Sequence, residues 1–397
     1  MKHAFIFSTN HDASIFPNIK VTNPNNTMEK LNLKFDRILC DVPCGGDGTI
    51  RKNADIWPVI SNIIRYLIWS SHLTSRVFLQ KWNGGSSSNL HGVQYRILKR
   101  GLELLEVGGR LVYSTCSLNP VEDEAVVQRM ILDAGKENVI IEDASALLPG
   151  LTYSKGLTSW KVASKDGDIY STWDEVGEKH QSQIRPYMFP SDEASSINIQ
   201  RCIRILPHQQ DTGGFFVCVL TKKALCDWES KPKTVEANGN GNTDGERKSV
   251  KEPPKKKPRR HQGFKEDPYI YFNSDEPLYK EISEYYGLTG GNLEPEMFLT
   301  RCKDTTKKNS LYYTSNIIRD IVMSNEDNLK IINTGVKAFT KCENKGATCD
   351  FRLAQDGALM TIPFMTKRII KPTLKDLEVL LLCNDVDMPP EHNELGK

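Results

Sequence analysis

The segment between residues 35 and 115 contains the pattern that most limits the possible folds. The run FDRILCDV (35–42) has the apolar and β-branched residues of a strand and leads into Pro43 and a glycine-rich turn. Residues 90–106 carry apolar side chains near helical spacing, and RLVYST (110–115) again has the composition of a strand. A strand, a helix and a strand in this order predict two parallel strands joined by a right-handed crossover. The pattern therefore predicts an α/β domain.

A cysteine follows each of these two predicted strands. Cys44 comes just after the first strand, and Cys116 directly follows the second. Ligand sites in open α/β sheets form at the carboxyl ends of the strands. We therefore expect the two thiols, although distant in sequence, to face the same crevice.

The residues around the cysteines leave several kinds of chemistry open. The turn GGDG (45–48) could approach a phosphate, but neither common glycine-rich phosphate-binding motif occurs in the chain. A cysteine hydrolase would need a histidine partner, and the spacing selects neither His91 nor His208. A helix predicted to start with Asn119 as N-cap and Pro120 at its first position would favour a thiolate at Cys116 through its dipole. The acids of its first turn, Glu122, Asp123 and Glu124, would act against the thiolate.

Composition excludes several other classes of protein. The chain has 397 residues, enough for two domains, and a net charge of +2. Its ten cysteines include no C-x-x-C pair, which indicates reduced thiols and argues against a zinc site, so we predict no metal. No apolar run approaches the roughly 18 residues of a membrane span. The N-terminus turns polar too early for a secretory signal.

The chain divides into three regions by composition. Residues 1–225 have the α/β pattern, with further strands predicted at 4–7, 202–207 and 213–222. Residues 226–262 are polar and rich in Lys, Pro and Gly, which predicts a disordered linker. Its basic run at 255–260 is either a nuclear-import signal or a patch for RNA phosphates. Residues 263–397 predict a second, α+β domain.

Two longer stretches carry a specific resemblance. DRILCDVPCGGDGTIRKN (36–53) and GGRLVYSTCSLNPVEDEAVV (108–127) resemble the two cysteine motifs of the NOP/Sun family of RNA cytosine-5 methyltransferases. Further segments are similar to those of the eukaryotic nuclear tRNA-modifying members: NHDAS, QIRPYMFP, RILPHQQDTGGFFVCVLTKK, GFKEDPYIYF, INTGVKAF and FRLAQDGA. The resemblance thus extends through most of the chain.

The resemblance implies a fold, a cofactor and partners. It implies a Rossmann-like S-adenosylmethionine-dependent methyltransferase fold whose first strands and glycine-containing cofactor loop would precede Met1. Residues 263–397 would be a partial PUA-like RNA-binding domain, so the chain is expected to be incomplete at both ends. The implied partners are tRNA or other RNA and, through 255–260, the nuclear-import machinery, which implies a location in the nucleus or nucleolus.

The resemblance also implies roles for single residues. Cys116 would be the nucleophile that adds to carbon-6 of cytosine, and Cys44 would assist release of the product. Asp41 would bind the pyrimidine edge near the methyl donor, and Asp12 the adenine end of S-adenosyl-L-methionine. Gly45 stands where the family usually has serine.

Two features depart from a complete enzyme of this family. Residues 58–80 have no counterpart in the family pattern and are either translated intron sequence or a lineage-specific insertion. The cofactor loop expected before Met1 is absent from the sequence. The alternative function is therefore a catalytically inactive RNA-binding fragment of such an enzyme.

Overall fold

The chain divides into two compact units, neither of which is contiguous in sequence. The computed structural model describes residues 5–53, 84–230, 268–289, 293–302, 309–342 and 348–383. The predicted insertion at 58–80 and the basic run at 255–260 lie outside these ranges. The cysteine unit contains His11–Lys20 and Leu31–Lys251, and the C-terminal unit contains Met1–Asn10, Val21–Lys30 and Glu252–Lys397. Met1–Asn10 and Val21–Lys30, which the sequence analysis assigned to the first domain, thus belong to the C-terminal unit.

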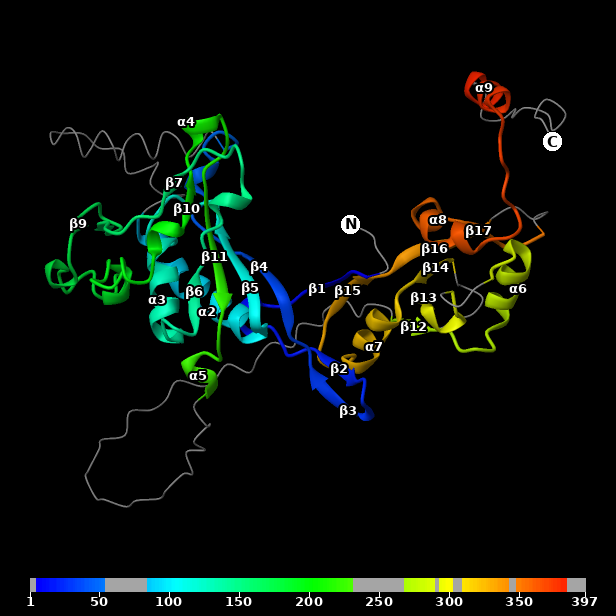
Figure 1. Cartoon of the computed structure of the whole chain (residues 1–397), viewed down its shortest axis with the longest axis horizontal. Coiled ribbons are helices and arrows are strands. Elements are labelled where there is room, and N and C mark those ends of the chain that lie inside the picture. Colours follow the sequence, from blue (N-terminus) through cyan, green and yellow to red (C-terminus); the bar gives the residue numbers. More distant parts are fainter. Residues whose placement is uncertain are drawn as a thin grey trace, which may run out of the picture. The chain divides into compact units, whose positions relative to one another are not determined.

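A six-stranded mixed sheet forms the centre of the cysteine unit (Figure 1). Its strands are β4 (Phe35–Asp41), β5 (Leu105–Thr115), β6 (Val139–Ile141), β7 (Ser154–Lys155), β10 (Ile203–Ile205) and β11 (Phe215–Lys222). The order is β4-β5-β11-β10-β7, and β6 also pairs with β11. The pair β4–β5 is parallel, with Asp41 opposite Ser114, whereas β11 is antiparallel to β5, β10 and β6. The parallel crossover predicted from the sequence is confirmed.

Two helices pack against this sheet. They are α2 (Gly84–Leu104) and α3 (Glu124–Ala134), which share the main hydrophobic core with β4, β5 and β11. The helix predicted at 90–106 lies almost entirely within α2, which ends two residues earlier and passes directly into β5. The buried ammonium of Lys222 donates to the carbonyl oxygen of Leu102 at 2.8 Å and pairs with Glu229 at 2.8 Å. These contacts satisfy carbonyls at the end of α2 that have no partner within the helix.

The start of α3 differs from the prediction. Asn119 accepts the backbone N–H of Val121 at 3.0 Å, so it caps a turn rather than the helix. The helix begins at Glu124, after Asp123 with φ of −107° and ψ of −97°. Residues 122–124 therefore do not form a solvated first helical turn, because all three of their side chains are buried.

Short elements complete the cysteine unit. They are η1 (Ala13–Ile15), η2 (Asp47–Thr49), η4 (Ser145–Leu147), β8 (Val162–Ala163), β9 (Ile169–Tyr170), η5 (Trp173–Glu175), η6 (Pro186–Met188), η7 (Ile199–Arg201), α4 (Pro207–Gln210) and α5 (Asp227–Ser230). The linker was predicted to begin at residue 226, but residues 226–230 belong to the folded unit, because Cys226 is buried and Trp228 of α5 packs against the main core. Residues 231–262 lie outside the described ranges.

The C-terminal unit has the mixed α+β character predicted from its sequence. Its five-stranded sheet has the order β12-β13-β14-β16-β17 and is entirely antiparallel (Figure 1). The strands are β12 (Ile270–Tyr271), β13 (Phe298–Thr300), β14 (Ser310–Tyr313), β16 (Val336–Lys341) and β17 (Phe351–Leu353). The helices are α6 (Pro277–Tyr286), η8 (Pro295–Met297), α7 (Asn316–Ser324), α8 (Gln355–Thr361), η10 (Ile362–Phe364) and α9 (Leu374–Leu382).

N-terminal residues complete the C-terminal unit. Strand β1 (Phe7–Thr9) pairs antiparallel with β15 (Ile331–Thr334) instead of joining the cysteine unit's sheet. The strand predicted at 4–7 therefore begins later and has a different partner. In the hairpin of β2 (Lys20–Asn23) and β3 (Asn26–Asn32), the Thr22 backbone N–H donates to Asp320 of α7 at 2.7 Å.

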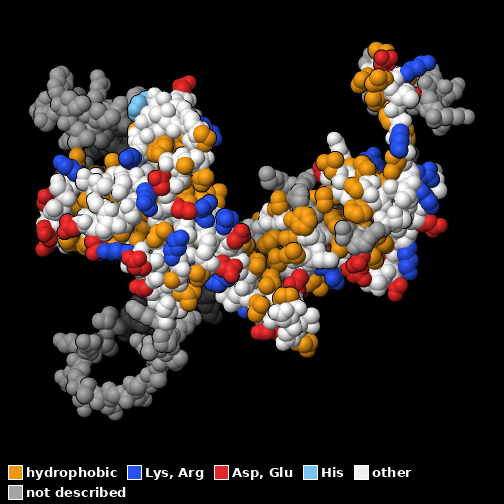
Figure 2. Space-filling model, viewed as in Figure 1, with side chains coloured by type: hydrophobic (Ala, Val, Ile, Leu, Met, Phe, Trp, Pro, Cys, Tyr) orange, Lys and Arg blue, Asp and Glu red, His pale blue; other side chains and the backbone are white. Residues whose placement is uncertain are grey.

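Helix α9 exposes most of its apolar side chains, which gather on its surface in Figure 2. A capping box between Thr373 and Asp376 fixes its start. Among the described residues, no helix is both long and apolar enough to span a membrane.

Candidate active site

The two predicted thiols lie side by side. The Sγ atoms of Cys44 and Cys116 are 3.2 Å apart, and both side chains are partly buried. Their strands are parallel neighbours, and the backbone N–H of Val42 donates to the carbonyl of Ser114 at 3.1 Å just before the turns. The sequence-based expectation that the two thiols lie together at the ends of neighbouring strands is thus met by the structure. Burial and the contact with Cys116 raise the pKa of the Cys44 thiol well above its usual value.

Two glycines allow the cysteine turns to approach a third segment. The N–H of Gly48 donates to the carbonyl of Cys116 at 2.9 Å, and the N–H of Gly214 donates to the carbonyl of Gly48 at 2.7 Å. A Cβ atom at Gly48 would lie 2.5 Å from the Gly214 oxygen and 2.7 Å from the Cys116 oxygen. Only glycine fits between these two backbones.

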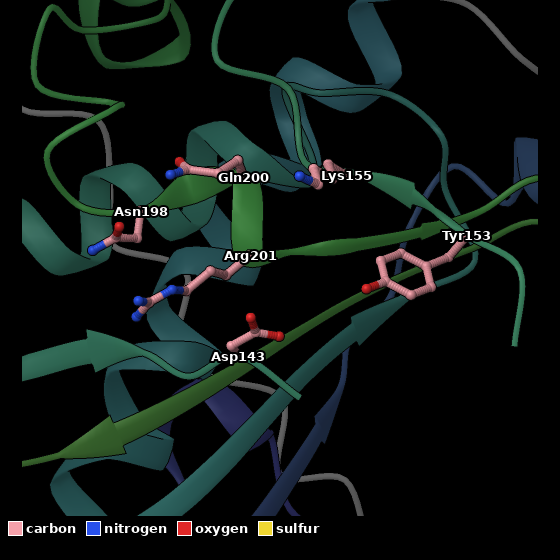
Figure 3. Close-up of a pocket in the computed structure, with 6 residues that line it drawn as sticks. All are labelled: Asp143, Tyr153, Lys155, Asn198, Gln200 and Arg201. Carbon is pink, nitrogen blue, oxygen red and sulfur yellow. The ribbon is translucent and has the colours of Figure 1, made fainter. Parts of the chain in front are cut away.

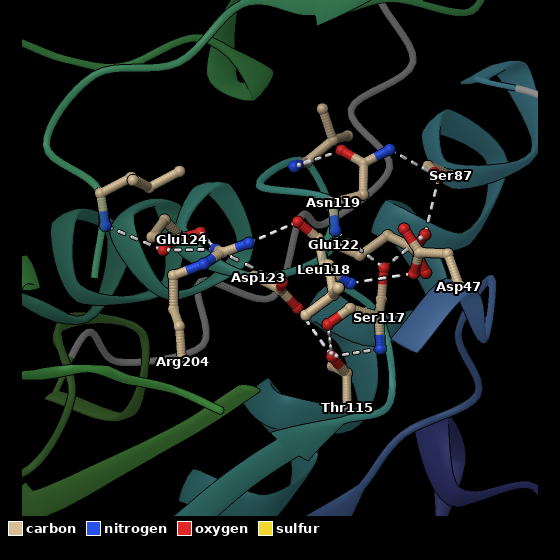
Figure 4. Close-up of polar contacts among 12 residues, drawn as sticks. Asp47, Ser87, Thr115, Ser117, Leu118, Asn119, Glu122, Asp123, Glu124 and Arg204 are labelled. Atoms are coloured by element: carbon tan, nitrogen blue, oxygen red, sulfur yellow. Dashed lines mark hydrogen bonds and ion pairs between the residues drawn. The ribbon is translucent and has the colours of Figure 1, made fainter. Parts of the chain in front are cut away.

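A buried carboxylate, Glu122, connects the two cysteine turns (Figure 4). Its Oε2 accepts the backbone N–H of Gly45 at 2.8 Å, next to Cys44. Its Oε1 accepts the hydroxyl of Ser117 at 3.2 Å, next to Cys116. Helix α2 adds the Ser87 hydroxyl at 2.6 Å and the Gln94 amide at 2.9 Å. Because residue 45 uses its backbone N–H, this contact does not depend on whether its side chain is that of glycine or serine.

A second buried carboxylate, Asp47, joins the same turns. Its Oδ1 accepts the backbone N–H of Leu118 at 2.8 Å (Figure 4). Burial raises the pKa of Asp47, although the hydrogen bond from Leu118 acts in the opposite direction. The Cys44 turn is therefore tied to the Cys116 turn at two points, through Asp47 and through Glu122.

One arginine balances the acidic residues at the start of α3. Arg204 of β10 lies 2.7 Å from both carboxylate oxygens of Glu124 and 3.7 Å from Asp123, and it also donates to the carbonyl of Leu118 (Figure 4). Burial, followed by the charge of Glu124, raises the pKa of Asp123 well above its usual value. Thr115 donates its hydroxyl to Asp123 at 2.7 Å. This cluster anchors the segment that follows Cys116.

The two predicted aspartates occupy different surroundings. Asp41 ends β4 with an exposed side chain, and its Oδ1 accepts the hydroxyl of Ser114 at 3.0 Å, so it lies beside the cysteine turns. Asp12 is the N-cap of η1 and accepts the backbone N–H of Ser14 at 2.9 Å. These hydrogen bonds from Ser14 lower the pKa of Asp12. Among the described residues, no hydrogen bond or ion pair joins Asp12 to the cysteine pair.

Neither histidine considered from the sequence lies in a hydrolase arrangement. His91 is buried, its Nδ1 is 2.8 Å from the carbonyl oxygen of Val121, and it stacks on Tyr187. Burial lowers the pKa of His91 to about 4. His208 is exposed in α4. Across the described ranges, no hydrogen bond joins either ring to a cysteine.

One group of side chains has the types that bind metals. Asp166, Asp168 and His180 bring their ligand atoms within 4.8 Å of one another. The ammonium of Lys179 already contacts Asp166 at 2.5 Å. Asp166 and Asp168 lie between β8 and β9, and His180 lies after η5. No hydrogen bond or ion pair in the described ranges joins them to the cysteine pair.

Sequence reasoning missed the residues that hold the cysteine turns. Glu122 was interpreted only as an acid in a helix start, Asp47 only as part of a turn, and Gln94 and Arg204 not at all. A signal was nevertheless present, since three consecutive acids directly after a short turn carry more charge than one helix N-terminus needs.

Comparisons with known families agree with these motifs. Residues 80–167 match the family described as 16S rRNA methyltransferase RsmB/F, and this range includes Cys116 and the three buried acids at 122–124. Residues 268–366 match the family described as the NSUN2 Pre-PUA domain. The second match gives the C-terminal unit a more specific description than the PUA-like domain expected from the sequence.

Several curated proteins are similar over nearly the whole chain. A tRNA (cytosine(34)-C(5))-methyltransferase of Drosophila melanogaster is 46% identical, covering 98% of this chain and 51% of its own length. Multisite-specific tRNA:(cytosine-C(5))-methyltransferases are similar too: trm4b of Schizosaccharomyces pombe at 34% identity (95% and 55% covered) and that of Saccharomyces cerevisiae at 33% (96% and 52%). The chain spans about half the length of these relatives.

Among solved structures, a methyltransferase homolog from Pyrococcus horikoshii is 27% identical, with a TM-score of 0.25, covering 48% of this chain and 40% of its own. Its low TM-score adds nothing to the sequence matches. Those matches and the two cysteine motifs lead to one conclusion. The chain belongs to the NOP/Sun family of RNA cytosine-5 methyltransferases.

Proposed function

We propose that this chain carries the methyl-transfer site of a tRNA cytosine-5 methyltransferase that uses S-adenosyl-L-methionine. The observation that carries this proposal is the 3.2 Å separation of two thiols at the ends of adjacent parallel strands. The similarity to tRNA cytosine-5 methyltransferases of fly and yeasts supports tRNA as the substrate. Other RNA molecules with an accessible cytosine fit the same chemistry.

The reaction explains why a thiol is needed. Carbon-5 of cytosine is a weak nucleophile until a thiolate adds to carbon-6 and pushes electron density toward it. Cys116 forms this bond in our proposal, and carbon-5 then takes the methyl group. The reaction ends when carbon-5 loses its proton and the bond between carbon-6 and sulfur breaks, which restores the thiolate. The base must leave its stack to reach the cysteines.

The second thiol, Cys44, has a raised pKa, which keeps its proton in place near neutral pH. Its S–H group can therefore donate a hydrogen bond to the Cys116 sulfur 3.2 Å away. The same group lies beside the reacting base during elimination, which suits a role in product release.

Two exposed carboxylates of this unit fit the methyl donor. When bound, S-adenosyl-L-methionine supplies a methyl group activated by a sulfonium charge. Asp41 offers an exposed carboxylate beside Ser114, suited to the positive charge of the donor or to a donor group on the pyrimidine. Asp12 offers an exposed carboxylate whose lowered pKa keeps it ionised, suited to hydroxyl or amino groups of the adenosine.

Two variants test the assigned roles. Cys116→Ser should abolish methyl incorporation into tRNA, whereas Cys44→Ala should accumulate a covalent RNA–protein adduct on denaturing gels. Calorimetric titration with S-adenosyl-L-methionine shows separately whether the chain binds the donor. Turnover by Cys116→Ser, or absence of an adduct with Cys44→Ala in a chain that binds donor and tRNA, would overturn the assignment. Saturable RNA binding without donor binding would support the alternative, an RNA-binding fragment without catalysis.

We also propose that the protein acts in the nucleus or nucleolus. The support is the basic run KKKPRR at 255–260, which has the composition of a nuclear-import signal. Replacing its lysines and arginines by alanine in a fluorescent fusion should move the protein to the cytoplasm. If the fluorescence stays in the nucleus, the run is not the import signal, and the alternative, a patch for RNA phosphates, is favoured.

A further inference from the structure

A polar pocket lies at the edge of the cysteine unit's sheet opposite β4. It has a volume of about 250 Å³ and is lined by Asp143, Tyr153, Lys155, Asn198, Gln200 and Arg201 (Figure 3). The lining comes from β7, from η7 and the residue before it, and from the segments next to them. None of these residues belongs to the cysteine network. We call this site the edge pocket.

The edge pocket offers two cationic donors. Arg201 donates one N–H to the carbonyl of Ile141 at 3.0 Å, which orients its guanidinium while leaving other N–H groups available. Lys155 is exposed, and within the described part of the chain no hydrogen bond or ion pair engages its ammonium. A lysine and an arginine placed together in a pocket suit a phosphate group.

The edge pocket also offers hydrogen-bond acceptors, for which a phosphate group alone has no donor. The Oε1 of Gln200 is buried and has no hydrogen-bond donor among the described residues. Hydrogen bonds from Ser145, together with the charges of Arg201 and Lys155, lower the pKa of Asp143, so its carboxylate is ionised. A ligand that satisfies the whole lining must combine an anionic group with hydrogen-bond donors. A ribonucleotide does so through its phosphate and its 2′-hydroxyl.

The register of the sheet relates the edge pocket to the cysteines. Asp41 pairs with Ser114, Ser114 with Val217, Val217 with Ile203, and Ile203 with Lys155. Lys155 thus lies on the same cross-strand row as Asp41, four strands away. At about 4.8 Å per strand, the two are about 19 Å apart across the sheet. A strand of RNA reaches this distance with a few nucleotides.

We propose that the edge pocket binds the ribose and phosphate of a nucleotide that flanks the target cytosine. Lys155 and Arg201 hold the phosphate, and Asp143 accepts the single hydrogen bond that the 2′-hydroxyl donates. The inference rests on the proposed function in one respect, namely that the substrate is RNA. Contacts of this kind position a nucleic acid without reading its sequence.

Binding of a fluorescein-labelled tRNA transcript, followed by anisotropy at several salt concentrations, tests the phosphate contact. Lys155→Gln should weaken binding about tenfold and reduce the salt dependence by about one unit of slope. Lys161→Gln, at another exposed lysine of the same unit, is the charge-matched control and should leave both unchanged. In methylation assays Lys155→Gln should raise KM for tRNA at unchanged kcat.

A DNA oligonucleotide and its RNA equivalent test the 2′-hydroxyl contact. The wild-type chain should prefer the RNA, and Asp143→Ala should lower this preference without weakening DNA binding. Equal tRNA affinity of Lys155→Gln and the wild type would refute RNA binding at the edge pocket and would leave the proposed function intact. No RNA binding by the wild type would overturn both. Binding of inorganic phosphate that Lys155→Gln abolishes, with unchanged RNA affinity, would assign the pocket to a small anion and refute the proposal.

Discussion

Glu122 hydrogen-bonds to the residue that follows each of the two cysteines. All four of its donors are neutral, namely one backbone N–H, one amide and two hydroxyls. A glutamine of the same shape can keep an oxygen toward Gly45 and Gln94 and turn its amide toward the hydroxyls, which can accept as well as donate. An alanine leaves all four groups without their partner. Comparing glutamine and alanine at this position therefore separates the effect of the hydrogen-bond geometry from that of the charge.

We expect Glu122→Ala to lose about 3 kcal/mol of unfolding free energy, because buried donors remain unpaired. It should also lose tight binding of phenylarsine oxide, which bridges two thiols only when they lie close together. Glu122→Gln should retain most of this binding, measured by titration and mass spectrometry. Glu124→Ala is the matched control, since Glu124 is equally buried but contacts Arg204 and Leu157 instead of the cysteine turns. Identical arsenical binding by both alanine variants would contradict the role of Glu122.

At the residue scale, the cysteine pair could be predicted and its support could not. Cys44 and Cys116 each follow a recognisable strand, and parallel pairing brings the two strand ends together. The contacts of Glu122 and Asp47 depend on how two turns and a helix pack, which leaves no periodic trace in the sequence. The aspartate roles implied by the family resemblance remain predictions.

At the scale of elements, Gly48 of η2 packs closely against Gly214, the residue before β11. We expect Gly48→Ala to lower the unfolding free energy by about 1–3 kcal/mol, because its Cβ would overlap two backbone oxygens that cannot move independently. Gly92→Ala within α2 is the control: its Cβ would meet only the end of the Arg96 side chain at 3.6 Å. This variant should gain up to about 1 kcal/mol from helix propensity. Urea unfolding measures both, and equal stability of the two variants would show that the turn adapts.

The junction of α2 and β5 depends on a buried lysine. Lys222→Met should cost about 3 kcal/mol, because the Leu102 and Leu105 carbonyls and the Glu229 carboxylate lose their donor. Lys223→Met, at the exposed neighbouring lysine, should change stability by less than about 0.5 kcal/mol. Thermal unfolding followed by circular dichroism compares the two. A similar effect of both substitutions would mean that charge, rather than capping, is responsible.

Elements were more predictable than their ends. Residues 90–106 and 110–115 indicated α2 and β5 because apolar periodicity is a local property. The start of α3 was misplaced because the rule for helix caps assumes that acids in the first turn are solvated. Here Glu122, Asp123 and Glu124 are buried in hydrogen bonds, and the helix begins only at the last of them.

At the scale of the whole molecule, the assignment of N-terminal residues was the part least accessible from sequence. Composition showed a boundary near residue 226 but gave no sign that Val21–Lys30 belongs with Glu252–Lys397. Such pairing depends on contacts such as that between Thr22 and Asp320, which are 298 residues apart. No local pattern encodes a partner at that distance.

This contact should make the hairpin sensitive to acid. Burial would raise the pKa of Asp320, but the hydrogen bonds from Thr22 and the charge of Lys30 outweigh it, and the pKa is lowered. A lowered pKa in the folded state gives stability that is present above the unfolded value near 4 and is lost as the pH falls through the folded value. The protection factors of residues 20–30, which correct for the slower intrinsic exchange in acid, should therefore fall at low pH in the wild type. Asp320→Ala should show the reduced protection factors already at pH 7, with those of β5 unchanged as the control; equal protection in both proteins would refute the contact.

The pairing of β1 with β15 also has a consequence for synthesis on the ribosome. Strand β1 waits until more than 300 further residues have been translated, since its partner begins at Ile331. Contacts this distant in sequence form late and slowly. During translation Phe7–Thr9 offers an unpaired strand edge, which chaperones bind and which other nascent chains can join. This segment is thus made long before its partner, and its pairing is completed late.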